Sequence, residues 1–163
     1  MKKLIGILVM LVVIVMSSCQ CQGQELWKGT TSSMNKEQVS EMFVDKITYK
    51  EAKYAGSTSY FYIDEIKIGL TPVRVDFLFS DLSNKLERVN IKVKEGYIKS
   101  ATESLKSKLT IKYGDPTTKE ITSGRKSYTW IVGATQITLN SINISVLKTV
   151  IIQYSVLKVD DNL

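Results

Sequence analysis

The chain has 163 residues, of which 44% are hydrophobic and 23% are charged, and this globular composition excludes a disordered or collagen-like protein. It contains no histidine, which excludes a Ser-His-Asp triad, a Cys-His pair and any histidine-ligated metal site. The formal net charge of +6 falls to +4 if Lys2 and Lys3 leave with a targeting segment. A balance this small gives no support for nucleic-acid binding.

The N-terminus has the pattern of an export signal. Two lysines precede an apolar run from Leu4 to Met16, which is shorter than the roughly 20 residues that a membrane-spanning helix needs. Ser17 and Ser18 then precede Cys19, and this order resembles the lipobox of bacterial lipoproteins, where a peptidase cuts before a cysteine that then carries lipid. Met16 departs from the Leu, Val or Ile that is usual there.

This resemblance implies a signal peptide at 1–18, a lipidated tether at 19–26 with the lipid on Cys19, and a membrane-anchored protein of the bacterial cell envelope that faces the periplasm or the cell surface. The alternative is an ordinary secretory signal cut between Cys21 and Gly23, which would release a soluble secreted or periplasmic protein. A lone C-x-C pair without histidine is weak as a metal site, so we expect no metal and no cofactor.

Two helices are predicted in the body of the chain. Asn35–Gln38 matches a capping box, and apolar residues spaced three and four apart follow it. Ser100–Glu103 repeats the capping signature before a second apolar stripe, and Gly114 and Pro116 are the residues expected to end that helix.

Strands with alternating polarity follow each helix. Residues 73–79 and 86–93 alternate between apolar and polar side chains, which predicts an antiparallel hairpin with one buried face. The run 59–68 precedes them, and a change of parity near Asp64-Glu65 indicates a β-bulge. The second half matches in order, with strands expected at 128–131, 137–139 and 147–154.

The shared order of elements predicts an α+β protein of two tandem helix-plus-three-strand repeats, at 27–98 and 99–163, with the helices packed on an antiparallel sheet. The residues from Met34 to Val39, together with Gly114 and Pro116, resemble motifs of small envelope modules of the SmpA/BamE type and of the related β-lactamase-inhibitor-protein-like fold. The resemblance implies helices laid across an antiparallel sheet, in tandem.

The face of the first hairpin that alternates with the core is basic. Its cations are Arg74, Arg88, Lys92 and Lys94. Arginine side chains can grip carboxylate or phosphate groups, which makes this face a candidate binding site, although a merely solvated sheet face has the same composition. The aromatic residues Tyr62 and Trp130 either line a binding groove or fill the space between helix and sheet.

We find no catalytic motif, phosphate-binding loop or facing pair of acids, so an enzyme is not expected. The predicted function is a non-enzymatic envelope lipoprotein that binds another envelope protein as an assembly factor or adaptor. The alternative is a binding module for an anionic ligand, such as a lipid headgroup or an acidic glycan.

Overall fold

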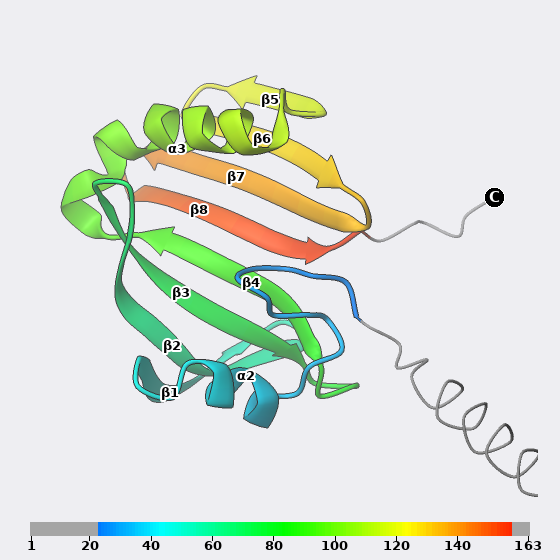
Figure 1. The fold of residues 1–163 in the computed structure, drawn as a ribbon. Coiled ribbons are helices and arrows are strands. Elements are labelled where there is room, and N and C mark those ends of the chain that lie inside the picture. The colour runs from blue at the N-terminus through cyan, green and yellow to red at the C-terminus, as the bar shows by residue number, and fades with distance from the viewer. Residues whose placement is uncertain (1–22, 158–163) are drawn as a thin grey trace, which may run out of the picture.

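The computed structural model describes residues 23–157. They form one antiparallel sheet of eight strands with two helices on one of its faces (Figure 1). In chain order the elements are α2 (Lys36–Met42), β1 (Ile47–Tyr54), β2 (Ser57–Ile68), β3 (Thr71–Ser80), β4 (Leu86–Val93), the 3-10 turn Glu95–Tyr97, α3 (Ile98–Tyr113), β5 (Thr118–Thr122), β6 (Arg125–Val132), β7 (Thr135–Ile144) and β8 (Leu147–Val156).

The strand order in the sheet is β1-β2-β3-β4-β8-β7-β6-β5. Each half of the chain therefore contributes a block of four consecutive strands, and the two blocks join where β4 pairs with β8. Every pairing is antiparallel, so one continuous sheet runs through both halves. The polar strands β1 and β5 form its two edges.

The core lies between the sheet and the helices. Alternate residues of the six inner strands point toward the helices and are buried, as the period of two in their sequences predicts. The inward facing expected from the alternating runs and from the apolar stripe of the second helix is confirmed: Phe77, Ile91, Leu105, Ile137 and Ile152 are all at most 2% exposed. The N-terminal segment, residues 23–34, adds to this core because Leu26 and Trp27 are buried in it, with the Trp27 ring 6.0 Å from Phe43 and 6.1 Å from Phe77.

The first helix begins as predicted. The side chain of Asn35 accepts a hydrogen bond from the backbone N–H of Gln38, and the Gln38 side chain accepts one from the backbone of Asn35. The second capping prediction is wrong. α3 begins at Ile98, so Ser100 lies inside the helix and its hydroxyl donates to the carbonyl of Tyr97. The end of α3 at Gly114, with φ of 83°, is confirmed.

The predicted class, an α+β fold of two helix-plus-three-strand repeats, is wrong. The described part of the chain is largely β, with 54% of its residues in strands and 19% in helices, and each half holds four strands. The extra strands are β1 and β5, whose side chains are mostly exposed on both faces. An edge strand that extends beyond the core has no buried face. Its apolar and polar residues therefore do not alternate, and a search for a period of two misses it.

The β-bulge predicted near Asp64-Glu65 is confirmed. The register between β2 and β3 shifts between Ile63 and Ile66, and Glu65 has a positive φ of 63°.

Candidate functional site

The face of the sheet opposite the helices is covered by no other described element (Figure 1). Its residues alternate with the core, and they are mainly threonine, serine, asparagine, glutamine and charged side chains. The strand registers align one residue of each strand in a row across this helix-free face: Thr118, Thr129, Thr138, Gln153, Asn90, Asp76, Tyr62 and Thr48. The half formed by β5–β8 is uncharged along this row, and the only charge lies on β3.

Asp76 is the centre of the charged half. Its side chain is 1% exposed although no helix covers it. Arg74 Nε and Nη2 lie 2.9 and 2.7 Å from one carboxylate oxygen, and Lys92 Nζ lies 3.2 Å from the other. One buried carboxylate therefore holds two of the predicted binding cations side by side.

Two tyrosines support this arrangement. The guanidinium of Arg74 lies 3.6 Å from the centre of the Tyr62 ring, and Lys92 Nζ donates a hydrogen bond of 3.3 Å to the hydroxyl of Tyr54. Long side chains that lean over their neighbours in this way bury Asp76 without a helix. We call this group the Asp76 cluster; it consists of Asp76, Arg74, Lys92, Tyr54 and Tyr62.

The charge of Lys92 is secured by these contacts. Partial burial lowers the pKa of its ammonium group, but the Asp76 carboxylate and the Tyr54 hydroxyl oppose that effect, and the net shift of the pKa is upward. Lys92 therefore stays protonated at every physiological pH and acts as a fixed cation.

The other two predicted cations also have acidic neighbours. Arg88 donates to the hydroxyl of Ser57 at 2.7 Å and lies 3.9 Å from a carboxylate oxygen of Glu87. Lys94 pairs with Asp64 at 2.9 Å, and this hydrogen bond is the main reason that the pKa of Asp64 is lowered. The structure thus brings Arg74, Arg88 and Lys92 onto one face, each with a carboxylate beside it.

Unsatisfied polar atoms concentrate on the same face. Of the four buried side-chain atoms in the described residues that lack a hydrogen-bond partner, three belong to Asp76, Arg88 and Asn90. For Asp76 Oδ2 the charge is met by the Lys92 ammonium at 3.2 Å, although the contact is not a well-aligned hydrogen bond. Arg88 Nε is a donor and Asn90 Oδ1 an acceptor, so the face retains both kinds of unmet polar group.

The structure separates the two aromatic candidates. Trp130 is 1% exposed on the helix-covered face, where its indole N–H donates to the carbonyl of Gly114 at 2.8 Å, whereas Tyr62 lies on the helix-free face. The two side chains therefore share no groove, and Trp130 packs in the core with Tyr128. In the observed register Trp130 lies opposite Ile137, which is buried on the same face.

Sequence reasoning missed the central role of Asp76 and the participation of Tyr54. Alternation along residues 73–79 assigns Asp76 to this face of the sheet, but it does not give the burial of the side chain. Tyr54 lies on β1, a strand that the sequence pattern did not reveal. A single carboxylate among four cations at alternate positions was the one available sign of an ion-pair centre.

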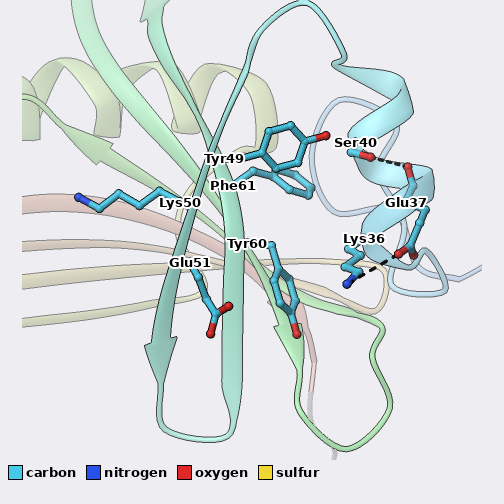
Figure 2. Close-up of a pocket in the computed structure, with 8 residues that line it drawn as sticks. All are labelled: Lys36, Glu37, Ser40, Tyr49, Lys50, Glu51, Tyr60 and Phe61. Carbon is cyan, nitrogen blue, oxygen red and sulfur yellow. Dashed lines mark hydrogen bonds and ion pairs between the residues drawn. The ribbon is translucent and has the colours of Figure 1, made fainter.

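A second candidate is an open pocket of about 460 Å³ between α2 and the β1–β2 hairpin (Figure 2). Figure 2 shows the Tyr49 ring beside Phe61, with Tyr60 directed away from them. The residues that line the pocket are Lys36, Glu37, Ser40, Tyr49, Lys50, Glu51, Tyr60 and Phe61. Its charged groups are exposed: Lys36 Nζ lies 3.8 Å from Glu37 Oε1 and 4.7 Å from the centre of the Tyr60 ring. Lys36 therefore has no buried counter-charge of the kind that holds Arg74 and Lys92.

The lipidation candidate Cys19, the signal peptide at 1–18 and the first part of the tether lie outside the described residues. Among the described residues the first contact is that of Gly23, whose backbone N–H donates to the Ser33 hydroxyl at 3.2 Å. Within residues 23–157, neither helix is long and apolar enough to cross a membrane. The same residues hold no group of three or more metal-ligating side chains.

Comparison of the chain with models of known families, with curated proteins and with solved structures found no match.

Proposed function

We propose that this protein is a non-enzymatic cell-envelope lipoprotein that binds another protein through the helix-free face of its sheet. The observation that carries the proposal is the Asp76 cluster on a face that no described element covers. Its cations are held in place by a buried carboxylate and two aromatic rings, so little side-chain entropy is lost when a partner docks.

The charge balance of the face favours a protein partner over a free anion. The four predicted cations lie beside three carboxylates, those of Asp76, Glu87 and Asp64. An anionic ligand would compete with these carboxylates, whereas a polar protein surface can meet both signs of charge and the uncharged Thr, Gln and Asn side chains.

An anionic ligand, such as a lipid headgroup or an acidic glycan, is the second candidate. The buried Arg88 Nε, which has no hydrogen-bond partner among the described residues, supports it because a carboxylate or phosphate oxygen would satisfy that donor. The neighbouring Asn90 Oδ1 favours a protein partner instead, since this unsatisfied acceptor needs a hydrogen-bond donor, which an anionic oxygen cannot supply.

The proposal contains no catalytic step. Its support is compositional: a chain without histidine lacks the commonest general acid-base group, and the carboxylate of Asp76 is already committed to two cations. The envelope location and the lipid anchor rest on the lipobox-like segment that ends at Cys19.

A matched pair of substitutions tests the docking face. Gln153→Arg places a bulky cation at the centre of the helix-free face, and Ser104→Arg makes the same charge change on the exposed side of α3. Each variant, and the wild type, is used to capture partners from detergent-solubilised membranes, with identification by mass. A partner held by the wild type and by Ser104→Arg but lost with Gln153→Arg supports the proposal; equal capture by both variants contradicts it.

Salt dependence separates the two candidates. Binding to a free anion weakens steeply between about 0.05 and 0.5 M salt, because the Debye length falls below roughly 5 Å over that range. A protein interface on this face loses less affinity over the same range, because its neutral Thr, Gln and Asn side chains form hydrogen bonds that salt does not screen. Binding to anionic vesicles or acidic glycans that disappears over this range, without any captured protein, would favour the second candidate.

A further inference from the structure

We infer that the body stands on the lipid bilayer on one particular end of its sheet, with the β3–β4 turn (residues 81–85) in the headgroup region. We call this end the anchor end; it comprises Gly23, the β3–β4 turn and the β6–β7 turn (residues 133–134). The inference rests on the lipid anchor of the proposed function and adds the orientation in which the helix-free face is presented.

Hydrogen bonds place the start of the body beside the β3–β4 turn. Gly23 and Gln24 donate to the hydroxyls of Ser33 and Ser32. The next residue, Met34, accepts a hydrogen bond of 2.8 Å from the backbone of Leu86, the first residue after the turn. The chain that leads to the anchor therefore leaves the body at this end of the strands.

The β6–β7 turn lies at the same end. The hydroxyl of Thr135, the first residue of β7, donates to the carbonyl of Glu25 at 2.7 Å. A pocket of about 470 Å³ has both Gln24 and Val132 in its wall, which confirms that the N-terminal segment borders this turn. Figure 1 shows the first described residues, in blue, on the side of the body where β8 ends and β7 begins.

The length of chain between anchor and body leaves little freedom. Only residues 19–22 separate a lipid on Cys19 from Gly23. At a maximum of roughly 3.3–3.6 Å per residue, Gly23 is held within about 15 Å of the lipid attachment. Because so short a tether keeps Gly23 close to the headgroups, the anchor end faces the bilayer.

The anchor end offers the side chains that suit a membrane interface. Leu82, at the tip of the β3–β4 turn, is 98% exposed, and Lys85 follows it in the same turn. Val132 is also exposed, beside the β6–β7 turn. An exposed aliphatic side chain next to a lysine inserts among acyl chains while the ammonium group contacts phosphate.

The opposite end supplies a matched control. Leu70 is 93% exposed in the β2–β3 turn, and β3 joins it directly to the turn that holds Leu82. A strand of ten residues is about 33 Å long, so Leu70 is expected to lie beyond reach of the membrane.

The test uses Leu82→Trp and Leu70→Trp in the full-length lipoprotein, purified from membranes and reconstituted in vesicles with brominated lipids. The native tryptophans Trp27 and Trp130 are buried and contribute equally to both samples. We expect bromine to quench the added emission at position 82, with a blue-shifted maximum, and to leave the added emission at position 70 unquenched. Equal quenching at both positions, no quenching at position 82 or stronger quenching at position 70 overturns the orientation.

The intact mass of the purified protein shows whether the orientation or the lipid anchor itself is the hypothesis that fails. Acyl chains on Cys19 with no preferential quenching at position 82 refute the orientation alone, while a mature chain without lipid refutes the anchor and the orientation with it. Insertion of ten Gly/Ser residues before Gly23 is a further check, since it should reduce the quenching at position 82 by relaxing the tether.

Discussion

Replacing the buried carboxylate by an amide is the sharpest test of the Asp76 cluster. Asp76→Asn preserves shape but leaves Arg74 and Lys92 without their shared counter-charge, and the new amide N–H₂ can face the Lys92 ammonium, a second donor, at about the 3.2 Å of the present ion pair. Breaking a fully buried ion pair from one side costs about 3–5 kcal/mol. Because both cations remain one-third exposed and can be hydrated, we expect a loss of about 2–3 kcal/mol in the free energy of unfolding.

Urea denaturation followed by circular dichroism measures this loss, which corresponds to a midpoint lowered by roughly 1–2 M. Asp64→Asn is the control, since its ion pair with Lys94 is about 40% exposed on both sides and is expected to contribute less than about 1 kcal/mol. If both variants lose the same stability, the cluster is not the centre that we describe. Lys92→Met should also reduce the cost of Asp76→Asn, because the two residues are coupled.

Three further predictions concern the core, a helix cap and pH. Leu105→Ala should cost about 2–5 kcal/mol in urea unfolding, because Leu105 is fully buried between α3 and the sheet; a cost below about 1 kcal/mol would contradict that packing. Asn35→Ala should cost about 1 kcal/mol by removing a capping box, whereas Ser100→Ala, inside α3, should be within about 0.5 kcal/mol of the wild type. Burial, and then its hydrogen-bonded neighbour Tyr113, raise the pKa of Tyr154, so the unfolded chain ionises first and stability is lost as pH rises above about 10. Tyr154→Phe should show a smaller loss between pH 9 and pH 11 than the wild type does, and an unchanged loss would refute this assignment.

The inner strands and the direction of their side chains could be predicted because apolar and polar residues alternate along a strand that has one buried face. Val75 and Phe77 on β3, and Ile91 on β4, point to the core as their spacing requires. The edge strand β5 could not be found in this way, since the residues 118–122 are exposed on both faces. The edge strands β1 and β5 are stabilised by backbone hydrogen bonds to their inner neighbours, and the polarity of their side chains does not reveal this pairing.

For the candidate site, the sequence predicted the face but not its organisation. Arg74 and Lys92 were placed correctly on one side of the sheet, yet their attachment to a single buried carboxylate depends on the register of β3 against β4, in which Arg74 lies opposite Lys92 and Asp76 opposite Asn90. Tyr54 lies on β1, which is separated from β3 by β2, so its contact with Lys92 depends on the order of the strands in the sheet. Register is set by turns and bulges, so it is accessible only from the three-dimensional arrangement.

The junction of β4 with β8 has a consequence for how the chain acquires its fold. β8 follows the other strands of the described chain, and synthesis proceeds from the N-terminus, so β1–β4 exist for a time with the open edge of β4 unpaired. That edge belongs to a central strand in which Val89, Ile91 and Val93 alternate with polar residues, and its unpaired backbone groups are a template for association with another chain. A chain truncated before Leu147 should therefore associate with other copies through β4, and a chaperone that shields this edge until residues 147–156 emerge would raise the yield of native protein.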